Sequence, residues 1–406
     1  MRILMLTELY PPAIGGVEIH VHTLSIELVS RGHEVAVATL WQEGQPELEI
    51  DQGVRIYRIR ASMQRAAFLF SEKGRTYSPP FPDPEVLWSL RHIILHERPD
   101  IVHAHNWIVH SFIPLKAWSK AKLVMTLHDF SFLCATRQFL HEGTICKGPA
   151  LGKCLKCAAK HYGPTKGIPT LLTNTISARA ERNVVDMFIP VNQAMAKETQ
   201  MAWHGVHYCV IPNFVPNDLS VSCDHNSPLL AQLPQENFLL FVGHVSRVKG
   251  AEVLLQAYAE MGSQIPLVLI GRAVLDFSVD LPPNVLMLQS WPHAAVMSAW
   301  GRCMVALIPS ICPETGPIVA IEAMTFGKPI AASWVGGLPD IVEDGETGLL
   351  VPPGDAHALR KAIQSLLDDP ARREYMGAMA KQRAIKFQVR EVVPRIEQVY
   401  QQVLHW

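Results

Sequence analysis

The stretch Met304-Val-Ala-Leu-Ile-Pro-Ser-Ile-Cys-Pro-Glu-Thr-Gly-Pro-Ile-Val-Ala-Ile-Glu322 joins an apolar run to the start of a helix. The apolar run predicts a buried strand, and apolar residues at helical spacing follow the Thr-Gly-Pro turn. Gly316 lets a ligand approach the backbone, and Pro317 suits the first position of a helix. The free N–H groups of Ile318 and Val319 would then face an anion, typically a phosphate.

Two glutamates stand on either side of this turn. Glu314 precedes the predicted helix, and Glu322 lies about two turns inside it. This separation predicts that the two carboxylates flank one extended ligand rather than share a metal ion. The other interpretation is an ordinary strand-to-helix turn with two solvated glutamates.

Length and charge narrow the class of protein. The chain has 406 residues, which predicts two domains, and its formal charge of −1 gives no reason to expect nucleic acid as a partner. We find no charged leader and no apolar run long enough to span a bilayer, so we expect a cytoplasmic protein. Peripheral contact with the inner face of a membrane is the open alternative, through a basic face formed by Lys73, Arg75, Lys116, Lys120 and Lys122.

The N-terminal half alternates buried strands with helices. Residues 3–6 predict a strand, Gly15-Gly16 a loop and the following residues a helix that ends at Arg31-Gly32, before a second strand at residues 35–40. This order is typical of a mononucleotide-binding unit, in which Gly16 would admit a phosphate or sugar close to the backbone. Alternatively, the two glycines serve only as a turn.

Two further predicted strands, residues 101–105 and 122–129, end in titratable residues. Ligands in open α/β sheets bind beyond the carboxyl ends of the strands. Chemistry is therefore expected near His105, Asn106, His128 and Asp129. We favour a functional role for His128, whereas His103 and His105 fit a structural role equally well.

A second α/β cycle begins at residues 238–243. Arg247 and Lys249 follow beside a glycine-bounded loop and suit a diphosphate, the arginine as a fork and the lysine as a point charge; alternatively both are solvated. Composition shifts to Pro, Asn, Ser and Asp before this cycle, which predicts a linker. The expected domains are residues 1–213 and 237–388, joined by residues 214–236, with a final helix at residues 389–406 packing toward the first domain.

Four cysteines gather between residues 130 and 163, where the α/β rhythm breaks. Cys154-Leu-Lys-Cys157 is a C-x₂-C pair, and Cys134 and Cys146 complete a tetrahedral set for zinc. A loop of this length without obvious structure of its own needs a reason to be ordered, and metal ligation would supply one. An iron–sulfur cluster, a redox disulfide or four unrelated thiols are the alternatives, since the outer spacings match no standard finger. A Cys₄ site is closed, so its role would be structural.

Taken together, the motifs resemble those of family 4 glycosyltransferases, which have two Rossmann-like domains facing a central cleft, the GT-B fold. The resemblance covers nearly the whole chain and rests on the order and spacing of residues 10–18, 100–105, 127–129, 210–213, 242–243 with 249–250, 309–322, 336–340 and 344–355. The cysteine-bearing loop also resembles one found in a subset of these enzymes.

The resemblance implies a role for each matched residue of the second domain. Glu314 would contact the donor sugar and Glu322 the ribose, while the backbone of residues 316–319 would take the distal phosphate. Lys249 would neutralise the diphosphate. The family usually has an arginine where this chain has His244, and Arg247 stands three residues further along. Ser290 would lie by the nucleotide base together with Trp291, which replaces a common small residue.

In the first domain, the resemblance places Gly16 against the phosphate or sugar and His128 beside the reacting carbon. The implied reaction transfers a sugar from a nucleotide-diphosphate sugar to an acceptor hydroxyl, with retention of anomeric configuration. No cofactor or catalytic metal is implied, because Lys249, Arg247 and the helix start would stabilise the leaving diphosphate. The acceptor stays open between a glycan, a lipid-linked sugar and a small molecule.

Two other functions fit the same architecture. A nucleotide-sugar epimerase would convert its donor without an acceptor, and a non-catalytic or redox-responsive binding protein would use the cysteine loop as its working part. An NAD-dependent oxidoreductase is disfavoured, because no G-x-G-x-x-G follows a predicted strand.

Overall fold

The computed structural model describes residues 1–13, 15–69, 78–235, 237–262, 264–274 and 281–406. The chain forms two compact units. Unit 1 comprises Met1–Phe139, Cys146–Pro212 and Val392–Trp406, and unit 2 comprises Leu140–Ile145 and Asn213–Glu391. Two members of the predicted basic face, Lys73 and Arg75, lie outside the described residues.

Unit 1 is built on a seven-stranded sheet with the order β3-β4-β2-β1-β5-β6-β9. All neighbouring strands are parallel except β3 and β4. The strands are β1 (Arg2–Leu6), β2 (Glu34–Leu40), β3 (Leu48–Asp51), β4 (Val54–Ile59), β5 (Ile101–Ala104), β6 (Lys122–Leu127) and β9 (Met187–Pro190). The central strands are mostly apolar, as expected for a sheet with helices on both faces, although β5 carries the buried His103.

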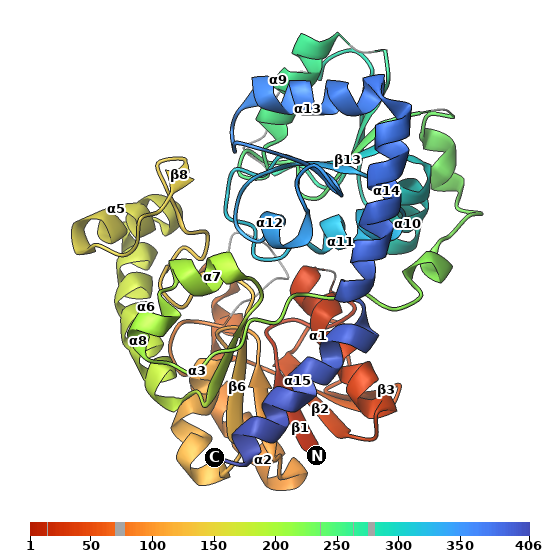
Figure 1. Ribbon diagram of the computed structural model, residues 1–406. Coiled ribbons are helices and arrows are strands. Elements are labelled where there is room, and N and C mark those ends of the chain that lie inside the picture. Colours follow the sequence, from red (N-terminus) through yellow and green to blue (C-terminus); the bar gives the residue numbers. More distant parts are fainter. Residues whose placement is uncertain (14, 70–77, 236, 263, 275–280) are drawn as a thin grey trace. The chain divides into compact units, whose positions relative to one another are not determined.

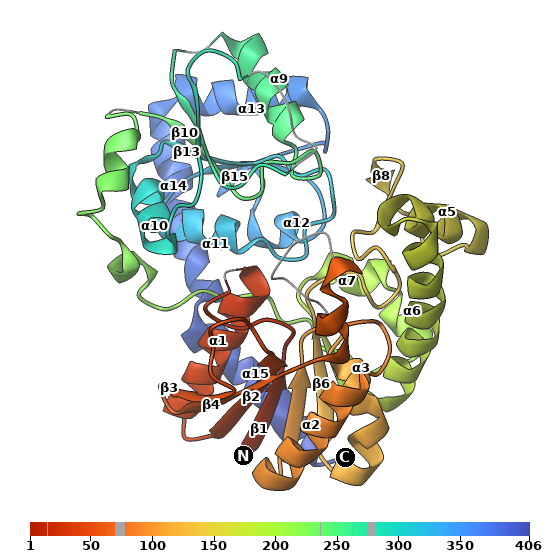
Figure 2. The same cartoon turned by 180° about the vertical axis from the view of Figure 1, so that it is seen from behind.

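The helices of unit 1 include α1 (Gly16–Ser30), η1 (Ser62–Leu69), α2 (Pro84–Glu97), α3 (Val109–Phe112), η2 (Ile113–Leu115), α4 (Lys116–Ser119), α7 (Gln193–Glu198), α8 (Met201–His204) and α15 (Val389–Leu404). Helix α2 begins where Asp83 caps it, accepting hydrogen bonds from the amides of Glu85 and Val86. Figure 1 shows α15 crossing one face of this sheet, and Figure 2 shows α2 and α3 on the other.

The C-terminal helix belongs to unit 1, as predicted, from Val392 onward. The Tyr400 hydroxyl lies 2.7 Å from Nδ1 of His103 on β5, and the Glu397 carboxylate accepts hydrogen bonds of 2.7 Å from Arg31 and His33. Val399, Val403 and the other buried residues of its inner face explain the amphipathic pattern of the segment.

The cysteine-bearing segment has more regular structure than the sequence suggested. Helix α5 (Leu151–Tyr162) occupies its second half, and α6 (Pro164–Val184) follows after one glycine. A short hairpin of β7 (Leu140–His141) and β8 (Thr144–Ile145) precedes them. The expectation of a loop was wrong because Leu, Lys and Ala, all good helix formers, dominate residues 151–160.

Unit 2 is built on a six-stranded parallel sheet with the order β12-β11-β10-β13-β14-β15. Its strands are β10 (Leu239–Val242), β11 (Leu267–Ile270), β12 (Val285–Leu288), β13 (Val305–Ile308), β14 (Ile330–Ser333) and β15 (Gly348–Val351). Its helices include η3 (Leu219–Ser222), η4 (Pro228–Gln232), α9 (Ala251–Met261), α10 (His293–Arg302), α11 (Ile318–Thr325), α12 (Leu338–Ile341), α13 (Ala356–Asp368), α14 (Pro370–Ala384) and η5 (Ile385–Phe387).

Strands and helices alternate in both units, so the predicted α/β class with two Rossmann-like units is confirmed. Among the described residues, no helix is both long and apolar enough to cross a membrane.

Candidate functional site

The turn between β13 and α11 forms the centre of a candidate site in unit 2. Gly316 has φ of 134°, a conformation that favours glycine, and its carbonyl accepts a hydrogen bond of 2.8 Å from the Asn213 side chain. Pro317 caps α11 rather than opening it, so the helix starts one residue later than predicted. Ile318 and Val319 are in its first turn, where backbone amides have no partner inside the helix.

A buried ion pair lies beside this turn. The Nζ atom of Lys249 is 2.7 and 2.9 Å from the two carboxylate oxygens of Glu314, and the Ser310 hydroxyl donates to the same carboxylate. Glu314 is only 7% exposed, whereas a third of the lysine side chain reaches solvent. Burial alone would lower the pKa of Lys249, but the charges of Glu314 and Cys312 and the hydrogen bond to Glu314 together outweigh it, so the pKa is raised and the ammonium stays charged.

Close backbone packing fixes the loops around this pair. A Cβ atom on Gly250, just after Lys249, would lie 1.8 Å from the carbonyl oxygen of Pro309. A Cβ atom on Gly336 would lie 2.3 Å from the carbonyl oxygen of Glu314, which also accepts a 2.6 Å hydrogen bond from Gly337. The three loops therefore meet backbone to backbone, and no larger residue fits at either glycine without displacing them.

Glu322 has a partner that the sequence did not predict. Its carboxylate lies 2.7 Å from Nε2 of His293, and this hydrogen bond raises the pKa of His293 against the effect of burial. His293 opens α10 soon after Ser290, which has a positive φ of 59°. His293 follows the predicted base-binding pair Ser290-Trp291 closely in sequence, and this was the one feature that could have pointed to it.

Arg247 does not take part in the Lys249–Glu314 ion pair. Its side chain is 80% exposed, and its Nε atom lies 3.5 Å from the carboxylate of Glu252.

A cluster of buried histidines lies at the carboxyl ends of β5 and β6 in unit 1. Nδ1 of His105 is 3.1 Å from Nε2 of His128, and the His20 ring centroid is 4.8 Å from that of His128. Burial lowers the pKa of His128 to about 4 and that of His103 to about 3. These imidazoles are therefore neutral at pH 7. Gly16 is the first residue of α1, and His20 lies one turn further along that helix.

The imidazoles of His20, His105 and His128 could hold a transition-metal ion. One ligand atom of each imidazole lies within 4.8 Å of those of the other two, and no other group of three metal-binding side chains in the described part of the chain meets this criterion. Neutral imidazole is the metal-binding form of histidine. His20 was missed from the sequence because a histidine on the inner face of a helix carries no motif.

Next to the histidines lie three charged side chains of unit 1, those of Glu8, Asp129 and Arg137. Arg137 donates a 2.7 Å hydrogen bond to Asp129 and lies 3.8 Å from the carboxylate of Glu8. Burial raises the pKa of Glu8 to about 7, although the charge of Arg137 opposes this shift. Glu8 follows β1 without forming any motif and could not be identified from the sequence, whereas Asp129 was expected at this edge.

The four cysteines of the predicted metal set are free and half-buried. Cys154 and Cys157 lie on α5, and Cys134 and Cys146 lie on the segment before it. Their sulfur atoms do not all lie within 4.8 Å of one another.

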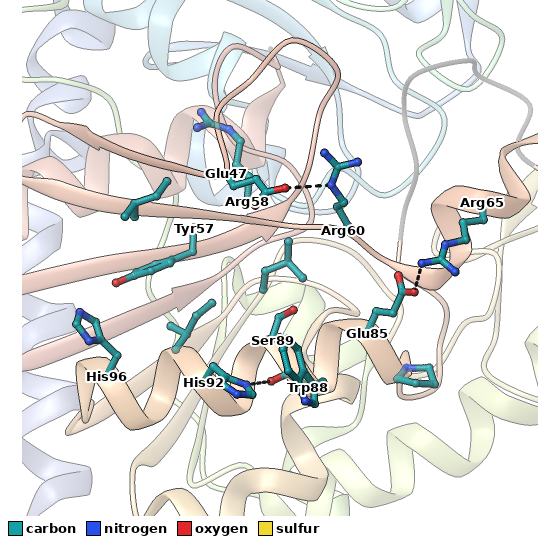
Figure 3. Close-up of a pocket in the computed structure, with 14 residues that line it drawn as sticks. Glu47, Tyr57, Arg58, Arg60, Arg65, Glu85, Trp88, Ser89, His92 and His96 are labelled. Atoms are coloured by element: carbon teal, nitrogen blue, oxygen red, sulfur yellow. Dashed lines mark hydrogen bonds and ion pairs between the residues drawn. The ribbon is translucent and has the colours of Figure 1, made fainter.

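A cavity of about 750 Å³ lies on unit 1 between β4, η1 and α2 (Figure 3). Trp88, which is 63% exposed, stands on α2 at this cavity, and two ion pairs, Arg60–Glu47 at 3.1 Å and Arg65–Glu85 at 2.5 Å, lie around it. The cavity is lined by Glu47, Leu48, Tyr57, Arg58, Ile59, Arg60, Arg65, Pro84, Glu85, Trp88, Ser89, His92, Ile93 and His96. An exposed aromatic ring among paired charges suits an uncharged polar ligand better than an ion.

Known proteins share this architecture over nearly the full chain. Glycogen synthase of Mycobacterium tuberculosis is 28% identical, over 98% of this chain and 94% of its own length. Sucrose-phosphate synthase from Thermosynechococcus elongatus superposes with a TM-score of 0.76 at 23% identity, covering 99% of both chains. Anabaena HepE, solved in complex with UDP-glucose, gives a TM-score of 0.69 at 18% identity, covering 98% of this chain and 99% of that one.

The fold and these likenesses define a glycosyltransferase built from two Rossmann-like units. The Glycosyltransferase Family 4 model matches residues 14–219, and the model for Glycosyl transferases group 1 matches residues 230–383. The chain belongs to glycosyltransferase family 4, so the resemblance read from its motifs is confirmed and the protein is an enzyme of this class.

Proposed function

We propose that the protein transfers a sugar from a nucleotide-diphosphate sugar to an acceptor hydroxyl, with retention of anomeric configuration and without a metal ion. The observation that carries the proposal is the Lys249–Glu314 pair beside the start of α11. A leaving nucleoside diphosphate develops negative charge, and a fixed ammonium with helix-start amides stabilises that charge without a divalent cation. The relatives support the donor class, since one solved structure contains UDP-glucose.

We assign the donor to the loops that meet in unit 2. Glu314 would hold the sugar while keeping Lys249 charged, and the amides of residues 316–319 would bind the distal phosphate. Glu322, oriented by His293, would accept hydrogen bonds from the ribose hydroxyls. Ser290 would contact the base. Arg247 would be a weaker, outer cation, because its side chain reaches far into solvent.

We assign His128 and Gly16 of unit 1 to the reacting sugar. Because burial holds the pKa of His128 near 4, its imidazole stays neutral and can donate a hydrogen bond to a sugar hydroxyl without adding charge. A general base from the protein is not needed for this step, since the departing phosphate can take the proton of the attacking hydroxyl.

An assay with a panel of nucleotide sugars, with and without candidate acceptors, tests this function. We expect release of nucleoside diphosphate that depends on both substrates and persists in a metal chelator. Nuclear magnetic resonance of the new anomeric centre should show the donor's configuration. Epimerised donor in the absence of acceptor would identify an epimerase instead, and failure to bind any nucleotide sugar would indicate a binding protein for another ligand.

We further propose that the acceptor is a glycan, as the free substrate or as the head of a carrier, and that it rests on the Trp88 cavity of Figure 3. The exposed indole offers an apolar face to a sugar ring, and the surrounding ion pairs offer hydrogen bonds to its hydroxyls. With the acceptor identified by the panel, Trp88→Ala should raise its KM about tenfold and leave donor affinity unchanged. Trp203→Ala, which removes another exposed indole of unit 1, is the control; equal KM values for both variants would contradict the assignment.

We place this activity in the cytoplasm, with or without contact with the inner face of a membrane. The eight cysteines are all free in the structure, which fits a reducing compartment.

A further inference from the structure

A chain of contacts brings the four cysteines of unit 1 together around α5. The Sγ atom of Cys134 is 3.2 Å from the Thr136 hydroxyl, which also hydrogen-bonds Cys157. Cys154 lies three residues before Cys157 on the same face of α5. Cys146 is joined to the helix through Lys153, whose Nζ atom is 3.2 Å from its sulfur.

The charges around these thiols favour a negatively charged cluster. Residues 146–180 contain no aspartate or glutamate, and a lysine adjoins three of the cysteines in sequence, at Lys147, Lys153 and Lys156. Four thiolates at one place repel one another unless a cation lies between them, whereas the surrounding lysines can balance the net charge of −2 that a divalent ion would leave.

Helix α5 has little hydrophobic burial of its own to hold it in place. Of the twelve residues of α5, all of which the structure describes, only Ala158 is fully buried, and Leu151 at the start of the helix is 73% exposed. The small apolar cluster beneath it consists of Ala135, Ala158 and Leu171 with the partly buried Cys154 and Leu155. A metal bound by cysteines of α5 and of the segment before it would add a fixed link that this small cluster does not provide.

We propose that Cys134, Cys146, Cys154 and Cys157 bind one zinc ion as a structural tetrathiolate centre. The C-x₂-C pair on α5 would supply two ligands from one helix face, and the two upstream cysteines would close the tetrahedron. Because the four sulfur atoms do not all lie within 4.8 Å of one another in the structure, binding would require the side chains to rotate about their Cα–Cβ bonds until four zinc–sulfur bonds of about 2.3 Å can form. Zinc binds cysteine in its thiolate form, so each cysteine that is a protonated thiol beforehand releases one proton when the metal binds.

Zinc suits this position better than the other tetrathiolate centres. All four cysteines are half-exposed, where a redox-active cluster would meet solvent and oxidants, whereas zinc has no redox chemistry. It also requires no inorganic sulfide. The lysine at Cys146 would remain as an outer partner that donates a hydrogen bond to the bound thiolate.

The centre would stabilise the loop that follows His128. The amide of Arg137 donates a 2.9 Å hydrogen bond to the carbonyl of Cys134, and the Tyr162 hydroxyl at the end of α5 donates one of 3.0 Å to Ala135. Arg137 in turn holds Asp129, the neighbour of His128. A metal at the cysteines would thus stabilise the loop around residues 134–137, from which Arg137 holds Asp129, and its role would be to position these charged residues rather than to react.

The proposal predicts about one zinc per chain in the full-length protein purified under reducing conditions without added metal, as measured by elemental analysis. Cobalt substitution should give the intense sulfur-to-metal charge-transfer bands of tetrahedral thiolate coordination. Cys157→Ser should lose most of the zinc and lower the thermal midpoint, whereas Cys209→Ser, which removes a half-buried thiol outside the cluster, should retain a full equivalent.

A second measurement does not depend on a variant that folds. Titration of the wild-type protein with a mercurial reagent, followed with a zinc-sensitive dye, should release the one zinc as four thiols react. Iron with acid-labile sulfide, a disulfide among these cysteines in protein isolated without oxygen, or zinc content equal in Cys157→Ser and the wild type would each overturn the proposal.

Discussion

The Lys249 ammonium lies 2.7 Å from the Glu314 carboxylate, although 64 residues separate the two in sequence. Through this contact, each residue stabilises the charge of the other. Glu314 is buried and would be costly without a cation, and the lysine keeps its proton because of the glutamate. The positive charge expected at a diphosphate site is therefore fixed by the protein before a donor arrives.

At His128, we expect the substitution His128→Ala to lower kcat about 100-fold while the donor Kd changes less than threefold. The reason is that the imidazole is assigned to the reacting sugar, whereas the diphosphate is assigned to unit 2. Steady-state kinetics and calorimetric titration of the donor measure the two quantities separately. His357→Ala, an exposed histidine of α13, is the control; unchanged kcat in His128→Ala would remove this residue from the active site.

The pKa of Glu8 predicts how stability depends on pH. Because burial raises this pKa from 4.5 to about 7, the unfolded chain ionises Glu8 at a lower pH than the folded chain does. The stabilising contribution is complete below pH 4.5 and is lost as the pH rises to 7, a change of up to about 3 kcal/mol. Chemical denaturation should show the unfolding free energy of the wild type falling relative to that of Glu8→Gln across this range. A constant difference between the two proteins would show that Glu8 titrates normally.

At the scale of elements, the loops of unit 2 to which we assign the donor depend on glycine at their points of contact. Gly336 has φ of 57°, and a Cβ there would lie 2.3 Å from the carbonyl of Glu314. Gly336→Ala should weaken donor binding at least tenfold and lower the unfolding free energy by about 2 kcal/mol, because it adds a steric clash to the backbone strain.

Gly345→Ala is the matched control for that prediction. Gly345 also has a positive φ, of 78°, but a Cβ there meets nothing within 4 Å. The alanine at Gly345 should therefore cost about 1 kcal/mol of stability and leave donor affinity unchanged. Equal donor affinities in the two variants would show that the loop contact at Glu314 does not shape the site.

The sequence predicted these elements well where a local pattern determines them. Buried parallel strands are continuous apolar runs, so both sheets and the turn at Gly316 could be anticipated. The segment with the cysteines was predicted less well, because its C-x₂-C pair is typical of a metal-binding loop although the residues around it favour a helix, α5. The start of α11 was displaced by one residue, since Pro317 suits the cap as well as the first turn.

Contacts between distant residues could not be predicted in the same way. Glu8, His20 and His293 carry no motif, and each gains its neighbours only when strands that are far apart in sequence become adjacent. The sequence likewise suggested that Arg247 and Lys249 act together, whereas the structure gives Arg247 a solvent-exposed position and pairs Lys249 with Glu314. Charge and spacing in the sequence do not show which of the two cations, Arg247 or Lys249, forms the ion pair with the buried Glu314.

At the scale of the whole molecule, membership of the family establishes the class of reaction. It does not identify the substrates, which depend on particular surfaces of the protein. Matches to family 4 and to group 1 cover most of the chain, so its two Rossmann-like units are those of a glycosyltransferase. We propose that the donor binds to unit 2 through backbone amides, one lysine and two glutamates. The proposed acceptor surface and the proposed zinc centre both lie in unit 1, at the Trp88 cavity and at the cysteines around α5.

The most direct test of the central claim is calorimetric titration of the protein with a set of UDP-, ADP- and GDP-sugars in the presence of a metal chelator. We expect at least one donor to bind without metal. Lys249→Ala should raise its Kd about 100-fold, corresponding to the ~3 kcal/mol lost with a buried charge partner, and Arg247→Ala should raise it less than tenfold. Binding that requires a divalent cation, or a Lys249→Ala variant with wild-type affinity, would contradict the account.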